Sequence, residues 1–186
     1  MRNLKALDQI LEELRGLMAS VGQEQMERLA DAILGANRIF VAGRGRTGLI
    51  TQAFAMRLMH LGMDVAIAGE VLTPGISSGD ILVAGSGSGE TRFTNLAADI
   101  AREFGATIAS ITSRPDSRLA KSANIVLVLP APTFRGGAVG QHVSAQPRGS
   151  LFEQGLWLLL DGIVLLLMQR LGISPEALLE RHANVE

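Results

Sequence analysis

Apolar residues recur along the chain at two spacings, and the two spacings alternate. Helical spacing over residues 3–19 and 23–34 predicts two amphipathic helices at the start of the chain. After them, short apolar runs typical of buried parallel strands alternate with further helical segments. The predicted strands are 38–42, 65–68, 81–84, 107–111 and 125–129, and the predicted helices between them are 49–61, 93–104 and 116–122. This order favours one α/β domain over residues 1–186. Its core would be a doubly wound parallel sheet of about five strands flanked by helices, with 1–35 as an N-terminal helical pair.

The most apolar stretch, residues 155–168, raises the question of a membrane. It is shorter than the roughly 20 residues that a bilayer requires, and Asp161 interrupts it, so we expect a core helix and no membrane contact. This helix and the N-terminal pair carry more apolar surface than one sheet face can cover. The sequence therefore predicts a homo-oligomer.

A glycine- and hydroxyl-rich turn joins the predicted strand 81–84 to the predicted helix 93–104. Glycines let the backbone approach an anion closely, and the first amides of a helix are unpaired donors. Ser86, Ser88 and Thr91 add neutral hydroxyl donors. A simple helix N-cap would need only one of them. The turn lacks the lysine of a P-loop, so we expect a small phosphomonoester here. The residues predicted to bind it are Ser86, Gly87, Ser88, Gly89, Glu90 and Thr91.

The turn after the first predicted strand, residues 43–48, matches the dinucleotide pattern G-x-G-x-x-G, and Glu70 stands where a ribose-binding acid would. A dinucleotide site is therefore a competing interpretation. Arg44 and Arg46 within this turn suit a terminal phosphate dianion better than a buried pyrophosphate. Because parallel strands end at one edge of the sheet, the two turns can converge on one phosphorylated ligand.

Ser150 and Glu153 follow a long irregular segment, 130–149, and open the apolar helix. The local pattern S-x-x-E is typical of a capping box, in which Ser150 is the N-cap and Glu153 bonds back to the backbone. At the edge of a cleft, the same carboxylate could instead be the base that removes a proton from carbon next to a carbonyl.

Composition excludes several classes of site. Seventeen basic and eighteen acidic residues give a net charge of −1, and no basic cluster suggests nucleic acid as a partner. The chain has no cysteine, which is compatible with the cytoplasm and excludes thiolate chemistry. Three scattered histidines, His60, His142 and His182, do not have the spacing of metal ligands, so we expect no metal site.

Three segments together resemble the sugar isomerase (SIS) domain family of phosphosugar-binding proteins. They are Gly43-Arg-Gly-Arg-Thr-Gly48, Gly85-Ser-Gly-Ser-Gly-Glu-Thr91 and Ser150-Leu-Phe-Glu-Gln154. Within that family, the full length is similar to the 6-phospho-3-hexuloisomerases, through 57–62, 70–75, 146–153 and the ending 181–186.

The resemblance implies an SIS-type fold, flavodoxin-like or Rossmann-like, and interconversion of arabino-3-hexulose 6-phosphate and fructose 6-phosphate without a cofactor. It implies Glu153 as general base, with Arg46 or Thr47 touching the substrate. His60, His142 or His182 would move the second proton, and such a histidine can come from a neighbouring subunit. It also implies the ribulose monophosphate pathway of formaldehyde fixation, a tetramer rather than a dimer, and a pairing with 3-hexulose-6-phosphate synthase. Another sugar-phosphate isomerase and a non-catalytic phosphosugar sensor are the alternatives.

Overall fold

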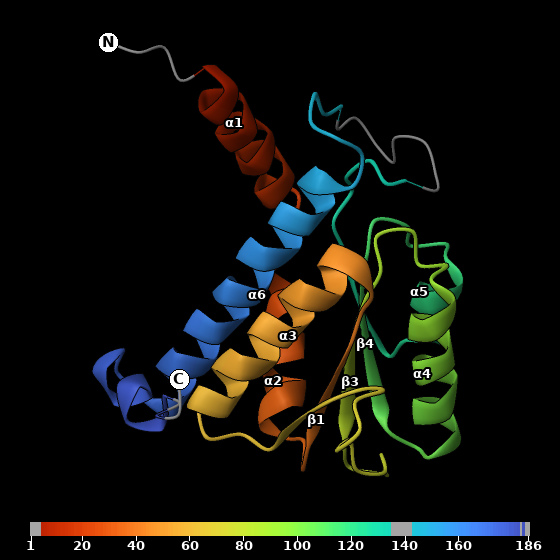
Figure 1. Ribbon diagram of the computed structural model, residues 1–186, viewed down its shortest axis with the longest axis vertical. Helices are drawn as coiled ribbons and strands as arrows, with labels where there is room; N and C mark the ends of the chain where they lie inside the picture. Colours follow the sequence, from red (N-terminus) through yellow and green to blue (C-terminus); the bar gives the residue numbers. More distant parts are fainter. Residues whose placement is uncertain (1–4, 135–142, 183, 185–186) are drawn as a thin grey trace.

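The computed structural model describes residues 5–134, 143–182 and 184, with the elements arranged as in Figure 1. Four helices belong to one side of the molecule: α1 (Lys5–Ala19), α2 (Gln23–Leu34), α3 (Gly45–His60) and α6 (Ser150–Leu171). The opposite side holds α4 (Arg92–Glu103) and α5 (Arg118–Ser122). Between them lie the strands β1 (Ile39–Ala42), β2 (Val65–Ile67), β3 (Ile81–Gly85), β4 (Thr107–Thr112) and β5 (Ile125–Val128).

All five strands are parallel, in the order β2-β1-β3-β4-β5. This order confirms the predicted doubly wound sheet. After β1 the chain forms β2 at one edge of the sheet. It then crosses to the other side of β1, where β3, β4 and β5 follow in order. The turns after β1 and β3 therefore flank the point at which the winding reverses, and open α/β sheets bind their ligands there.

Alternation along each strand divides the core into two layers. Ile39 and Val41 of β1 face the layer of α1, α2, α3 and α6, whereas Phe40 and Ala42 face the layer of α4 and α5. Side chains on both faces of the sheet are buried, which explains why these strands are apolar throughout rather than alternating.

Two predicted elements differ from the structure in ways that affect function. The third helix was expected to begin at Leu49, but α3 begins at Gly45, so four of the six residues of the first glycine turn, 43–48, are helical. The second difference concerns the apolar side of α4. Its buried residues are Thr94, Asn95, Ala98 and Ala101, whereas the larger side chains of Leu96, Ile100 and Phe104 are exposed.

The helix α6 is 22 residues long and, within the described residues, is the one helix long and apolar enough to cross a bilayer. The expectation that its length excludes a span is therefore wrong. However, more than half of the apolar window is buried against the rest of the fold. Leu156, Leu159 and Ile163 are fully enclosed, as expected for the central helix of a globular domain.

The chain ends in a short 3₁₀ helix, Glu176–Arg181. Ser174 Oγ accepts a hydrogen bond from the N–H of Ala177 at the start of this helix. The guanidinium of Arg181 donates to the carbonyl of His60, so this segment packs on the end of α3.

Candidate functional site

The turn between β3 and α4 is braced from behind by the neighbouring elements. The carbonyl of Gly87 accepts hydrogen bonds from the N–H of Ser113 (3.0 Å) and from Thr112 Oγ1 (3.2 Å). The carbonyl of Gly89 accepts from Asn95 Nδ2 and from the N–H of Leu119, both at 3.1 Å. With its carbonyls held towards β4, α4 and α5, the turn has its shape fixed in advance of any ligand.

The hydroxyl groups of this turn differ in what they do. Ser86 is buried, its Oγ accepts the N–H of Gly89 at 3.1 Å, and it shares a 2.9 Å hydrogen bond with Thr91 Oγ1. Ser88 is partly exposed and accepts the N–H of Glu90 at 3.2 Å. In the described part of the chain, the N–H groups of Gly87, Ser88 and Thr91 have no acceptor. Ser86 thus shapes the turn, while these amides remain available to an anion.

Glu90 braces the same turn from its outer side. One carboxylate oxygen of Glu90 accepts the N–H of Arg118 at 2.9 Å, at the first residue of α5. Glu90, one of the residues predicted to bind the ligand, therefore ties the turn to the start of α5.

The two glycine turns meet, as predicted. A Cβ placed on Gly85 would lie 3.0 Å from Thr47 Cγ2, so Thr47 packs directly against the beginning of the second turn. The two arginines of the first turn diverge. The guanidinium of Arg44 lies 3.5 Å over the ring of Phe93, whereas Arg46 turns towards α6.

The first turn of α6 approaches the β3 turn closely. A Cβ on Gly87 would lie 3.1 Å from Phe152 Cδ1, so a side chain at position 87 would require the ring of Phe152 to shift by a few tenths of an ångström. The capping-box prediction is wrong. The N-cap is Gly149, in the left-handed conformation at φ 92°, with no side-chain cap. Ser150 is the first helical residue.

The carboxylate of Glu153 pairs with Arg46, which lies 107 residues earlier in the chain. Arg46 Nε donates to Glu153 Oε2 at 2.5 Å. The glutamate side chain is 12% exposed and the arginine side chain is 67% exposed. A largely enclosed carboxylate is thus covered by a cation that solvent and ligands can reach.

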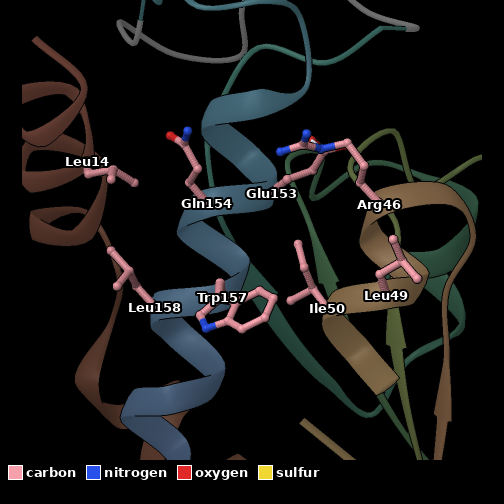
Figure 2. A pocket seen from close by; sticks show the side chains of 8 residues that line it. All are labelled: Leu14, Arg46, Leu49, Ile50, Glu153, Gln154, Trp157 and Leu158. Atoms are coloured by element: carbon pink, nitrogen blue, oxygen red, sulfur yellow. Dashed lines mark hydrogen bonds and ion pairs between the residues drawn. The ribbon is translucent and has the colours of Figure 1, made fainter. Parts of the chain in front are cut away.

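A pocket of about 430 Å³ opens at this ion pair. Figure 2 shows the two charged groups facing one another, with Ile50 and Trp157 beneath them and Leu14 on the α1 side. The lining also includes Leu49, Gln154 and Leu158. Sequence reasoning did not identify Leu14 or Gln154. The adjacency of Gln154 to Glu153 was a usable signal, and its Oε1 is buried without a partner among the described residues.

His60 and His182 lie away from this pocket. His60 is buried at the end of α3, about 20 Å along the helix axis from Arg46 at 1.5 Å per residue. Its ring stacks on that of His182, with the centroids 5.3 Å apart. Within one chain, the structure does not bring these two rings to Glu153. His142 lies outside the described residues. No group of three or more acidic or histidine ligands capable of holding a metal occurs in the described part of the chain.

The chain is similar to known proteins both in sequence and in structure. The family model of the SIS domain matches residues 32–146. A protein named 3-hexulose-6-phosphate isomerase from Bacillus subtilis is 39% identical over the whole of both chains. Its namesake from Mycobacterium gastri is 42% identical over 97% of this chain and 89% of its own. A crystal structure of a hypothetical protein from Methanococcus jannaschii, for which that function was inferred, superposes with a TM-score of 0.84 at 29% identity. The superposition covers 98% of this chain and 100% of the other.

Ser86 and Ser88 should respond differently to replacement by alanine. Ser86→Ala removes the buried hydroxyl that bonds Thr91 Oγ1 and the N–H of Gly89, and that N–H keeps its second acceptor, the carbonyl of Ser86. It should therefore lower the free energy of unfolding by about 1 kcal/mol. Ser88→Ala should leave stability nearly unchanged but reduce the rise in melting temperature that fructose 6-phosphate produces. Thermal unfolding with and without the sugar phosphate measures both effects. Equal loss of stability in the two variants would contradict the assignment.

Proposed function

The chain belongs to the SIS domain family, and on that premise we propose that it is a sugar-phosphate isomerase acting on 3-hexulose 6-phosphate. The observation that carries the proposal is Glu153, an enclosed carboxylate beside the preshaped phosphate turn. The family model ends at residue 146 and does not include Glu153. The full-length relatives named as 3-hexulose-6-phosphate isomerases therefore support the specific activity more than the domain match does.

The proposed reaction moves a carbonyl from C3 to C2 of the phosphorylated hexulose. Glu153 removes the proton on C2, the C–H electrons form the C2=C3 double bond, and the C3 oxygen gains a proton, giving a cis-enediol. Glu153 then returns its proton to C3 while the C2 hydroxyl loses its proton and becomes the carbonyl. Atoms and electrons balance without a cofactor or metal. A positioned base of this kind contributes roughly 10² to 10⁴ in rate.

The phosphate turn would serve as an anchor remote from the reacting carbons. Its amides and Ser88 bind the phosphate, and the resulting orientation contributes to the rate without any chemistry by the turn itself. For the proton transfer between the two oxygens we keep His60, His142 and His182 as candidates. His60 and the His182 ring stacked on it would have to come from a neighbouring chain, because α3 carries His60 away from Glu153 of its own chain.

Arg46 would link binding to chemistry. A phosphosugar offers this guanidinium new oxygen acceptors, and its shift towards the ligand would release Glu153 from the ion pair. The base would then be uncovered mainly when substrate is present.

Glu153→Gln tests the base directly. Conversion of 3-hexulose 6-phosphate, followed by detection of fructose 6-phosphate with and without a chelator, should fall by at least about 10²-fold, because the amide cannot accept the C2 proton. The melting temperature and the stabilisation by fructose 6-phosphate should change little. Asp161→Asn, an exposed carboxylate on the same helix, is the matched control and should keep full activity.

The same assay separates the alternatives. Retained activity in Glu153→Gln would remove this residue from the base role. An inactive wild-type protein that is still stabilised by fructose 6-phosphate would favour a phosphosugar sensor. Turnover of arabinose 5-phosphate or a heptulose phosphate instead would favour another isomerase of the family.

Arg46→Ala should separate binding from chemistry. Loss of a charged hydrogen bond to the ligand should raise KM by about 10-fold or more, while kcat falls by less, because Glu153 no longer has to leave an ion pair. The matched control is Arg44→Ala, whose guanidinium stacks on Phe93 instead. Steady-state kinetics of the two variants gives the comparison, and identical effects on KM would contradict the role of Arg46.

Two separate apolar faces support a homo-oligomer, and a tetramer rather than a dimer. One face follows α1, α3 and α6 and includes Leu11, Leu49 and Leu158, which are 58%, 65% and 45% exposed. The other follows α4 and the segment after β2, with Leu96 57% and Val71 98% exposed. A tetramer with twofold symmetry uses at least two kinds of interface, and a second copy of the chain offers the same apolar surfaces. We place this assembly in the cytoplasm, in the ribulose monophosphate pathway beside 3-hexulose-6-phosphate synthase.

Light scattering tests the assembly. The wild-type protein should have the mass of four chains. Leu158→Glu and Leu96→Glu, which each place a charge on a different apolar face, should each give dimers. Lys5→Glu, an exposed position on α1 that is already charged, should leave the mass unchanged. A monomeric wild-type protein would overturn the proposed oligomer.

A further inference from the structure

One carboxylate outside the proposed chemistry makes an unusually complete set of hydrogen bonds. Glu13 lies on α1 and is partly buried. Its oxygens accept from Ser144 Oγ at 2.6 Å, from the N–H of Ala145 at 3.0 Å and from Gln146 Nε2 at 2.9 Å. Helix carboxylates are usually solvated, whereas this one holds three consecutive residues that lie more than 130 positions away.

The held segment leads directly into the helix of Glu153. Ser144 Oγ also accepts the N–H of Gln146, so the three residues form a local turn around the carboxylate. The next turn is closed by the N–H of Ser150 donating to the carbonyl of Pro147. Glu153 then donates its own N–H to the carbonyl of Gly149, the N-cap of α6. Only six residues therefore lie between Gln146, the last residue that Glu13 holds, and the proposed base.

The helix α1 also contacts the beginning of α6 directly. A Cβ on Gly155 would lie 2.5 Å from Leu17 Cδ2, and Leu17 is completely buried. Leu14, the neighbour of Glu13, lines the pocket that Glu153 and Arg46 close. α1 thus contacts the chain on both sides of Glu153 in sequence: Glu13 binds residues 144–146 before α6, and Leu17 packs on Gly155 within α6.

We propose that Glu13 is a positioning residue for the isomerase reaction. By holding Ser144, Ala145 and Gln146 against α1, it fixes the turn that starts α6 and therefore the place of the Glu153 carboxylate over the phosphate turn. This role rests on the proposed function of Glu153, but the hold of Glu13 on the segment can be measured without any turnover.

The ionisation of Glu13 agrees with this role. Burial acts to raise the pKa of the Glu13 carboxyl, but the hydrogen bonds from Ser144, Gln146 and Ala145 outweigh it, so the pKa lies below its ordinary value. A depressed pKa means that the stabilisation is complete above the pKa of the unfolded chain and is lost as the pH falls through the folded value. At neutral pH the carboxylate holds the segment fully.

Glu13→Gln keeps the size of the side chain but replaces one acceptor oxygen by a donor that faces other donors. We expect kcat to fall by about 10- to 100-fold, as when a catalytic group is misplaced by about 1 Å, while KM changes by less than twofold. The phosphate turn is built by β3, β4, α4 and α5 and does not depend on Glu13. The matched control is Glu12→Gln, which changes an exposed carboxylate at the preceding position on α1.

Two readouts do not require activity. Amide hydrogen exchange of a peptide covering 143–153 should be faster in Glu13→Gln than in Glu12→Gln, because the N–H of Ala145 loses its acceptor. Trp157 is the single tryptophan of the chain and lines the same pocket one turn after Glu153, so its fluorescence should change in the same variant. These two results stand even if the wild-type protein proves to be no isomerase.

Ser144→Ala completes the test. If Glu13 acts through this segment, Ser144→Ala should reproduce part of the loss in kcat, and the double variant should lose less than the product of the two single effects. The inference is overturned if Glu13→Gln matches Glu12→Gln in exchange and fluorescence. It is also overturned if the single effects on kcat multiply in the double variant, or if Glu13→Gln lowers kcat only in proportion to the folded fraction.

Discussion

The contact between Phe152 and Gly87 is the constraint on which the rest of the site depends. Phe152 is buried, and its ring lies so close that a Cβ at position 87 would be 3.1 Å from Cδ1. Because Glu153 is the next residue, this contact sets the distance between the carboxylate and the turn that would hold a phosphate. A glycine that sequence patterns assign to anion binding therefore has a second role, which is to let the helix of the proposed base approach closely.

The electrostatics of the site follow from this placement. A carboxylate that is only 12% exposed needs a partner, and Arg46 provides one from the neighbouring glycine turn. The β3 turn offers neutral donors in the form of amides and hydroxyls, so its affinity for an anion does not require a second buried cation. In the proposed mechanism, Glu153 and a phosphorylated ligand would compete for Arg46, so binding of the ligand and release of the Glu153 carboxylate would be one coupled equilibrium.

Local patterns predicted the parts of the fold that are locally determined. Each strand was placed to within one residue, because buried parallel strands are short apolar runs between turns. The same reasoning failed where the conformation of a residue depends on a partner far away in the sequence. The pattern from Ser150 to Glu153 has the form of a capping box, yet Glu153 pairs with Arg46 across 107 residues. The apolar spacing of α4 was correct as a helix signal, but small side chains such as Ala98 and Ala101 face the sheet.

The role of α1 was the least predictable part of the site for the same reason. The apolar spacing of α1 predicts an amphipathic helix but does not identify its packing partner. Nothing in that spacing distinguishes Glu13 from the solvent-exposed charges of the same helix. What distinguishes Glu13 is the set of donors converging on it from Ser144, Ala145 and Gln146, which no spacing within α1 can reveal. The anchor for a phosphate is local in sequence and can be recognised from it. The position of Glu153, the proposed base, depends on α1, on Arg46 and on the turn after β3. These segments lie far apart in the sequence and come together only in the folded chain.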